Sequence, residues 1–376
     1  MKIVYMGTPE FAVAPLQSLL ESGYEVVGVI TVPDKPKGRG LQMSQSDVKK
    51  YMCANYPNIP LLQPVSLRDP NFLEQLKSLN ADLFIVVAFR MLPECVWQMP
   101  KLGTFNLHAS LLPKYRGAAP INWAIINGER KSGVTTFFID KEIDTGEIIL
   151  QKEVEILPNE TAGSLHDKLM EMGKSAVIET VKLIETNNYK RYSQEEILKK
   201  IIESENIMAN VGSDVTDKKE RNVFIAPKLN SENTTIKWSL TACEIDRLIR
   251  GLSPYPAAIT KLVRNTSPAT DDASNSSSEF SSLSTESSAF VEEIPFKIFG
   301  SSPLESSDIQ KIMTLSELNC ETLPCGHIVI TKSRELFVKC SDGFLQITEL
   351  QMSGKKRMRS SDFLLGFRDL EKYRFV

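Results

Sequence analysis

Short apolar runs alternate with helical patterns along the first half of the chain. Residues 2–6 form an apolar run that ends at Gly7, and apolar residues then recur at helical spacing up to Gly23. Further apolar runs, the first of them rich in β-branched residues, follow at 25–31 and 83–88. Buried strands that alternate with helices predict a parallel sheet covered by helices on both faces, with ligands outside the carboxyl ends of the strands.

The pattern of apolar, polar and glycine residues changes along the sequence and predicts two domains. We expect an α/β, Rossmann-like domain over residues 1–190 and a polar, helix-prone linker over 191–210. From 211 to 376, short strand-like runs separated by glycine turns predict a small C-terminal β-barrel. Within it, residues from about 265 to 292 are Ser-rich and acidic. Such a segment cannot bury enough apolar area to fold, so we predict a disordered insert.

Composition narrows the class of protein. The chain is 42% hydrophobic and 24% charged, which is ordinary for a globular protein, and it contains no apolar run of the roughly 18 residues that a membrane span requires. Its six cysteines form neither a C-x-x-C pair nor a set with metal-ligand spacing. We therefore expect a cytoplasmic protein with reduced thiols and no membrane association.

The net charge is −3, but its distribution leaves room for a nucleic-acid partner. Residues 265–296 carry six acidic side chains and no Lys or Arg. Without this segment the formal charge of the chain changes from −3 to +3. The remainder is slightly basic, which permits an RNA partner without requiring one.

Three polar residues form the strongest candidate for chemistry. Asn106 and His108 are two residues apart, so on an extended strand they project from the same face, and Asp144 stands in an Asp-Thr-Gly turn. Such a set suits acyl transfer to an amine. An amide or imidazolium group stabilises the oxyanion, and a carboxylate orients the histidine and helps to remove the proton of the amine. The other two histidines, His166 and His327, lie in a helical stretch and a glycine turn, where surface or capping roles are expected.

Other kinds of chemistry find less support. A glycine after the first strand invites a dinucleotide-binding interpretation, but the segment G-T-P-E-F-A supplies one glycine where that fingerprint needs three. The sequence also shows no metal-ligand cluster, nucleophile elbow or phosphate-binding loop.

The Asn-x-His pair, the S-L-L-P turn after it and the Asp-x-Gly turn resemble the folate-dependent formyltransferases. The resemblance implies that Asn106, His108 and Asp144 are catalytic and that the donor is 10-formyltetrahydrofolate, with no metal. Where the family usually has an aromatic-Gly pair beside the pterin, this chain has Phe89-Arg90. The implied folate-binding residues are Ser110, Leu111, Leu112, Pro113, Phe89, Arg90 and Leu92.

Further segments resemble the members of this family that act on methionyl initiator tRNA. These are the basic loop at 31–40, the segments at 226–229 and 236–238, and the basic stretch at 351–358. The resemblance implies transfer of a formyl group to the α-amino group of the methionyl residue, giving formylmethionyl-tRNA for translation initiation. The implied tRNA-binding residues are Lys35, Lys37, Arg39, Lys355, Lys356 and Arg357.

Two alternatives remain at this level. The acceptor is another amine, on a ribonucleotide or an amino sugar nucleotide, or the chain binds folate or RNA without catalysis. Single-domain relatives with other acceptors end near residue 190, whereas this chain continues, and the Asn-x-His and Asp-x-Gly motifs are intact. We therefore expect an enzyme acting on initiator tRNA, and we expect a monomer.

Overall fold

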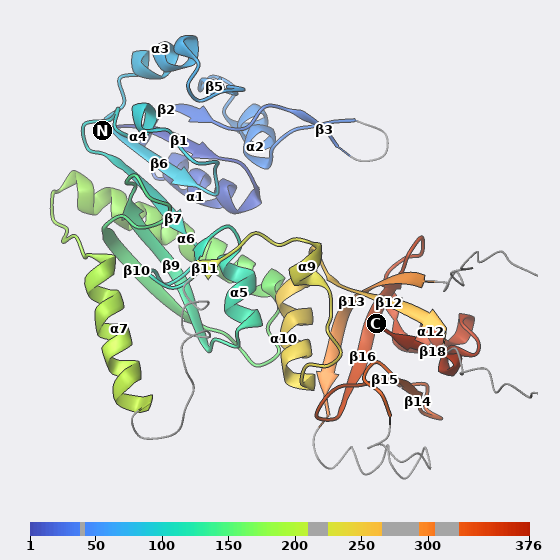
Figure 1. Cartoon of the computed structure of the whole chain (residues 1–376). Coiled ribbons are helices and arrows are strands. Elements are labelled where there is room, and N and C mark those ends of the chain that lie inside the picture. Colours follow the sequence, from blue (N-terminus) through green and yellow to red (C-terminus); the bar gives the residue numbers. More distant parts are fainter. Residues whose placement is uncertain (38–41, 210–224, 265–292, 305–322) are drawn as a thin grey trace, which may run out of the picture. The chain divides into compact units, whose positions relative to one another are not determined.

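The computed structural model describes residues 1–37, 42–209, 225–264, 293–304 and 323–376 (Figure 1). The chain divides into two compact units, Met1–Leu229 and Asn230–Val376. The predicted insert at 265–292 lies outside the described residues, as does Arg39 of the basic loop.

Two elements bear on the predicted division of the chain, which stays a prediction. Much of the predicted linker at 191–210 is helix α7 (Gln194–Ala209). The first unit also extends beyond residue 211, because strand β11 (Ile225–Ala226) pairs with β8 (Arg116–Gly117) inside it.

The first unit is built on a seven-stranded sheet in the order β10-β9-β7-β6-β1-β2-β5. Strands β7, β6, β1, β2 and β5 are parallel, which confirms the Rossmann-like α/β fold. The prediction of a parallel sheet is wrong at β9, which runs antiparallel to both of its neighbours, β7 and β10. A loop rather than a crossover helix joins β9 to β10, as an antiparallel pair allows. The strands are β1 (Lys2–Gly7), β2 (Glu25–Ile30), β5 (Leu61–Leu62), β6 (Leu83–Val87), β7 (Thr104–His108), β9 (Lys131–Phe138) and β10 (Ile148–Glu155).

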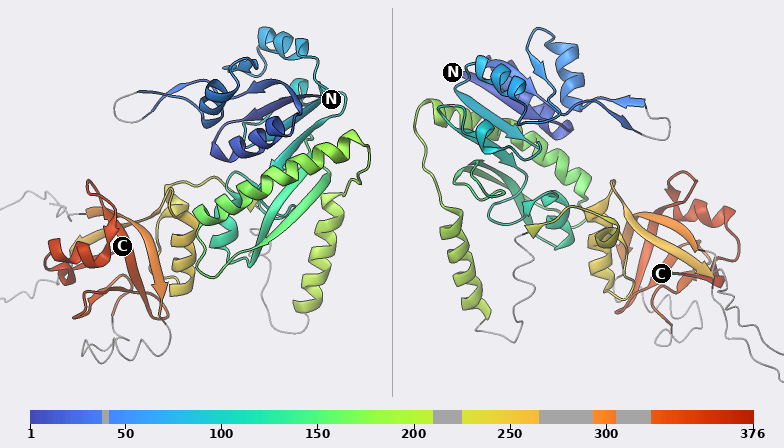
Figure 2. Two further views of the ribbon diagram at one scale, coloured as in Figure 1. Left: turned by 180° about the vertical axis from the view of Figure 1, so that it is seen from behind. Right: turned by 45° about the horizontal axis from the view of Figure 1, so that its top comes forward.

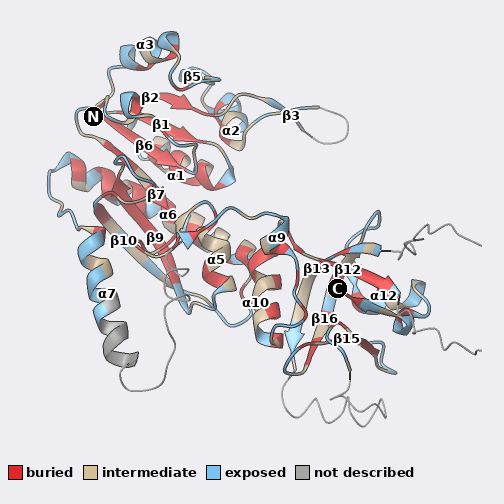
Figure 3. Cartoon of the chain, in the orientation of Figure 1, coloured by how far each residue is buried: buried red, intermediate tan, exposed pale blue. Residues whose placement is uncertain are grey.

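Helices cover both faces of this sheet, and Figure 2 shows α1 and α6 crossing one face from behind. The buried strands appear as the red centre of the unit in Figure 3. Helix α6 begins where the Thr161 side chain accepts a hydrogen bond from Ser164 N–H, and it packs a stripe that includes Leu165 and Leu169 against the sheet. The helices are α1 (Glu10–Glu21), α2 (Asp47–Asn55), α3 (Pro70–Ser78), α4 (Glu94–Trp97), α5 (Pro120–Ile126) and α6 (Ala162–Glu185).

The second unit is an antiparallel, nearly closed sheet, which confirms the predicted barrel. Its two ends approach where Phe375 N–H donates to Gly326 O over 2.9 Å, and Trp238 stacks on Phe375 in its core. Its strands are β12 (Ala258–Arg264), β13 (Glu293–Pro303), β14 (Ile328–Ile330), β15 (Leu336–Lys339), β16 (Phe344–Met352), β17 (Met358–Arg359) and β18 (Tyr373–Phe375). Its helices are α9 (Ser231–Thr234), α10 (Ala242–Leu252) and α12 (Ser360–Gly366).

None of the helices within the described ranges is both long and apolar enough to cross a bilayer.

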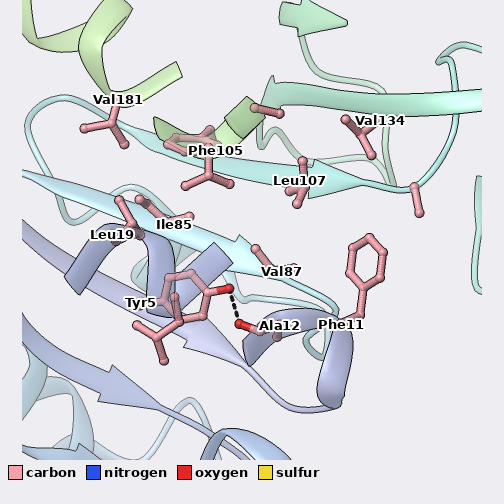
Figure 4. Close-up of a cluster of buried hydrophobic side chains, with 14 of the residues drawn as sticks. Tyr5, Phe11, Ala12, Leu19, Ile85, Val87, Phe105, Leu107, Val134 and Val181 are labelled. Atoms are coloured by element: carbon pink, nitrogen blue, oxygen red, sulfur yellow. Dashed lines mark hydrogen bonds between the residues drawn. The ribbon is translucent and has the colours of Figure 1, made fainter. Parts of the chain in front are cut away.

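The core of the first unit contains one polar contact that anchors α1 to β1. Tyr5 is fully buried, and its hydroxyl donates to the carbonyl oxygen of Ala12 over 2.6 Å (Figure 4). Burial raises the pKa of Tyr5 well above its ordinary value, so the hydroxyl stays protonated and remains a donor.

Removing the Tyr5 hydroxyl alone should measure how much its hydrogen bond contributes to the free energy of unfolding. We expect Tyr5→Phe to lower the free energy of unfolding by about 1–2 kcal/mol, since a buried hydrogen bond is lost without a cavity. Tyr5→Ala, which also leaves a cavity, should cost about 3–5 kcal/mol. Urea denaturation of both variants beside the wild type tests this, and a Tyr5→Phe protein as stable as the wild type would show that the bond contributes nothing.

Candidate active site

His108 is the last residue of β7, and its buried ring is held by the backbone. The ring nitrogen Nε2 lies 2.8 Å from the carbonyl oxygen of Tyr115. A carbonyl oxygen only accepts, so Nε2 carries the proton and donates it. The second ring nitrogen, Nδ1, is therefore the one that is available for chemistry.

The Tyr115 carbonyl is in turn fixed by its own side chain. Tyr115 is buried and adopts a left-handed backbone conformation, with φ of 62°. Its hydroxyl donates to Glu129 over 2.9 Å, and Asn127 donates to the hydroxyl. Burial and the Glu129 carboxylate raise the pKa of Tyr115 above its ordinary value, so the hydroxyl stays protonated. The orientation of the His108 ring thus depends on Tyr115, whose backbone conformation is held by the contacts of its own side chain.

Asp144 reaches His108 from the loop between β9 and β10. Its Oδ2 atom lies 3.7 Å from Nδ1 of His108 and accepts a hydrogen bond of 2.9 Å from Gly117 N–H. A separation of 3.7 Å exceeds the roughly 3.2 Å of an N–H···O bond, so the two groups face each other without a direct hydrogen bond. In the register of β9 with β7, the Asp144 loop leaves at the opposite end of β7 from His108, and it must fold back along the sheet.

Asn106 supplies an unsatisfied polar atom beside this pair. It lies on β7 two residues before His108, and its Oδ1 atom is buried with no hydrogen-bond partner among the described residues. Buried polar atoms are rarely left unpaired, so this acceptor oxygen points to a hydrogen-bond donor from outside the described part of the chain. The three residues predicted from sequence are therefore placed for one site, in which a carboxamide, an imidazole and a carboxylate can act on a carbonyl and an amine.

A cavity of about 630 Å³ is lined in part by residues that follow β6, the strand next to β7, along the chain. Of the predicted folate-binding residues, Arg90 and Leu92 line it, together with Trp97 and the cations Arg68 and Lys141. The Arg90 guanidinium donates to the carbonyl oxygens of residues 64 and 65 and lies over the ring of Phe89 at 5.7 Å. Arg90 therefore both lines the cavity and holds residue 65 of its wall in place through a hydrogen bond.

The predicted folate-binding turn at 110–113 has a different place. Its buried Leu112 packs with Phe137 and Ile148, and Ser110 donates through its hydroxyl to the Lys114 carbonyl over 2.7 Å. These residues are not in the lining of the 630 Å³ cavity. They stabilise the turn that leads to Tyr115. The S-L-L-P motif alone predicted folate binding and gave no sign of this structural role.

The predicted tRNA-binding residues fall into three groups. Lys35 is exposed on β3 (Lys35–Lys37), which pairs with β4 (Gln42–Ser44) as a hairpin, whereas the side chain of Lys37 lies outside the described residues with Arg39. Lys355 and Lys356 are exposed in the second unit. Arg357 is held in an ion pair with Glu349 and lies over Phe299 at 4.3 Å, so its charge is already paired.

Comparisons with known proteins decide the family. A profile described as formyl transferase matches residues 1–181, and one for the C-terminal domain of formyl transferases matches residues 228–368. Methionyl-tRNA formyltransferase of Flavobacterium johnsoniae is 45% identical over 97% of this chain and 96% of its own length. That of Bacteroides thetaiotaomicron is 43% identical over 100% of this chain and 98% of its own. The chain belongs to the methionyl-tRNA formyltransferases.

The family assignment confirms two predictions from the sequence, the resemblance to the folate-dependent formyltransferases and the class of enzyme. It also disfavours the alternative that the acceptor is a ribonucleotide or an amino sugar nucleotide. Solved structures add the fold. The sugar 3N-formyl transferase WlaRD has a TM-score of 0.54 at 21% identity, covering 95% of this chain and 99% of that one. HypX of Aquifex aeolicus, solved with tetrahydrofolic acid, has a TM-score of 0.52 at 15% identity, covering 97% of this chain and 47% of that one.

The turn after Asp144 provides a test of the site. A Cβ atom on Gly146 would lie 1.7 Å from the carbonyl oxygen of Phe138, so any side chain must open the loop. We expect Gly146→Ala to displace Asp144 and to lower the rate of formyl transfer at least about tenfold, since small misplacements of catalytic groups are costly. Gly366→Ala is the matched control, because a Cβ there meets nothing within 4 Å. Equal activity of both variants would show that the loop is not held this tightly.

Proposed function

We propose that the chain transfers the formyl group of 10-formyltetrahydrofolate to the α-amino group of methionyl initiator tRNA. The observation that carries this proposal is the similarity over the whole chain to proteins named methionyl-tRNA formyltransferase, at 43–45% identity. The geometry of Asn106, His108 and Asp144 supports it independently, because this set suits acyl transfer to an amine.

The cavity fits the chemistry of a reduced folate. Its wall offers apolar contact from Leu92 and Trp97 for a flat heterocycle, and Arg68 and Lys141 offer positive charge for the carboxylates of a glutamate tail. Lys141 stands three residues before Asp144 on the same loop, and Arg90 and Leu92 follow the strand next to β7. HypX, a protein of the same fold, is solved with tetrahydrofolic acid.

The roles of the side chains follow from their contacts. Bound 10-formyltetrahydrofolate supplies a formyl carbonyl attached to N10, which departs as an amine. Nδ1 of a protonated His108 and the carboxamide of Asn106 stabilise the charge that develops on the formyl oxygen. The Asp144 carboxylate accepts, directly or through water, the proton that the attacking amine loses, and a proton passes to N10 as the bond between N10 and the formyl carbon breaks.

The basic hairpin is proposed to hold the acceptor end of the tRNA. Its base is fixed by Lys49, whose Nζ contacts Asp34 at 2.7 Å and Gln63 at 2.9 Å. Both Lys49 and Gln63 donate hydrogen bonds to Asp34, which lowers its pKa, so it stays charged. An anchored hairpin can present Lys35 to phosphates, and Arg39, Lys355 and Lys356 are proposed as further phosphate contacts.

The protein is proposed to work in the cytoplasm. Cys53, Cys95, Cys243 and Cys325 are exposed and unpaired, a state that a reducing compartment preserves.

The direct test mixes purified protein, 10-formyltetrahydrofolate and charged initiator methionyl-tRNA, and measures formylmethionine after hydrolysis of the ester. Free methionine and an amino sugar nucleotide serve as competing acceptors. Formylation of the tRNA alone is expected. Formylation of the sugar nucleotide in preference to the tRNA would overturn the proposed acceptor.

The catalytic side chains should be separable from folding. We expect His108→Ala to lower kcat about 10²–10³-fold, the usual loss of an oxyanion stabiliser. Asp144→Asn, although nearly isosteric, should lose about 10²–10⁴-fold because its carboxylate handles the proton. Circular dichroism should show both variants folded. A His108→Ala rate within about threefold of the wild type would remove His108 from the mechanism.

Substitutions in the hairpin should change the KM for tRNA and leave the KM for folate unchanged. We expect Arg39→Ala, and to a lesser degree Lys35→Ala, to raise the KM for tRNA by about tenfold, the weight of one or two charged hydrogen bonds. The wild type should lose tRNA affinity steeply with salt, and the variants less steeply. Lys131→Ala, which removes an exposed cation paired with Glu153, is the control. Unchanged tRNA kinetics in Arg39→Ala would exclude the loop from recognition.

A further inference from the structure

Gln194 is a buried polar residue at the start of α7, in the segment that the sequence marked as linker. It is 2% exposed, and its side chain reaches into the loop that carries Asp144. The Nε2 atom donates to the carbonyl oxygens of Asp144, over 3.0 Å, and of Gly146, over 2.8 Å. Both carbonyls belong to the turn that aims the Asp144 carboxylate, since Asp144 itself has a left-handed backbone with φ of 55°.

Arg116 holds the other end of the same amide. Its Nε and Nη2 atoms donate to Oε1 of Gln194 over 3.0 and 2.7 Å. All the hydrogen-bonding positions of the Gln194 amide are thereby used, two as donors and two as acceptor sites. Burial lowers the pKa of Arg116, whereas four nearby carboxylates, Asp144 foremost, oppose this shift.

These contacts close a ring around the catalytic carboxylate. Gln194 binds the backbone of Asp144, Arg116 binds Gln194, and Gly117, the next residue along, donates its N–H to the Asp144 side chain. The segment 115–117 is itself fixed from outside, because β8 pairs with β11 and the Ala118 N–H donates to Ala226 O over 2.8 Å. The same segment supplies the Tyr115 carbonyl that orients His108.

We propose that Gln194 and Arg116 are positioning residues that set the distance between Asp144 and His108. This inference rests on the proposed formyl transfer, in which Asp144 acts on the amine. A carboxylate held 3.7 Å from Nδ1 has a narrow working range, because a shift of about 1 Å either closes the gap to a direct bond or separates the groups. Displacements of that size cost about a hundredfold in rate.

The first experiment substitutes Gln194→Met in the full chain, which keeps the volume and removes the hydrogen bonds. We expect kcat to fall about ten- to a hundredfold while the KM values for folate and for tRNA stay within about threefold. The control is Thr180→Val on α6, which removes a buried hydroxyl bonded to Thr136 and Ala176 away from this ring. If Gln194 has a merely structural role, both variants should be less stable than the wild type, and kcat per folded molecule should be unchanged in both.

The second experiment is a double-mutant cycle with Asp144→Asn. If Gln194 acts through the Asp144 carboxylate, Gln194→Met should add less than about threefold to the loss already caused by Asp144→Asn. Fully additive losses would overturn the proposal, because they would mean that Gln194 serves something other than Asp144.

A third variant keeps the proposal testable if Gln194→Met fails to fold. Gln194→Glu retains the acceptor for Arg116 but replaces the donor with an oxygen that repels the two carbonyls of the turn. We expect Gln194→Glu to fold, because its ion pair with Arg116 remains, and to lose kcat as Gln194→Met does. Wild-type kcat in a folded Gln194→Glu would contradict the inference. The wild type assayed beside it separates the two proposals, because a wild type without formyl transfer would contradict the function instead.

Discussion

The hydrogen bond from Nε2 of His108 to the carbonyl oxygen of Tyr115 is the contact on which the rest of the site depends. Because the carbonyl can only accept, the bond fixes the ring orientation and commits Nε2 to donating. Only Nδ1 then faces Asp144, at 3.7 Å. The adjacent Gly117 N–H binds the carboxylate of Asp144, so one short stretch of backbone holds both side chains that are proposed to be catalytic.

This dependence explains why so much of the first unit converges on residues 115–117. The Tyr115 ring and its hydroxyl hold a left-handed backbone that an exposed tyrosine would not keep. Strand β11 pairs with Arg116 and Gly117 from one side, and Gln194 binds Arg116 from the other. Gln194 at the start of α7 and strand β11 therefore both contact this part of the site, although the sequence predicted only a linker and the start of the next domain there.

The sequence predicts those parts of the site that follow from periodicity. Asn106 and His108 share a face because strands alternate with period two, and the buried runs before them required a sheet. The contacts of Tyr115 and Gln194 leave no comparable signal, since they involve backbone carbonyls that every residue carries. The fold-back of the Asp144 loop also escaped prediction, because it depends on β9 running antiparallel to β7. Likewise, Arg357 reads as a free cation until its pairing with Glu349 is seen.

The central claim, that the Tyr115 carbonyl fixes the proton of His108 on Nε2, can be measured directly. The chain has three histidines, so ¹⁵N NMR of a histidine-labelled protein, with His108→Ala to assign the signals, can resolve this ring. In the neutral form of the ring, the account predicts a protonated Nε2 and an unprotonated Nδ1. A neutral His108 with its proton on Nδ1 would contradict it, because the Tyr115 carbonyl would then have lost the donor that orients the site.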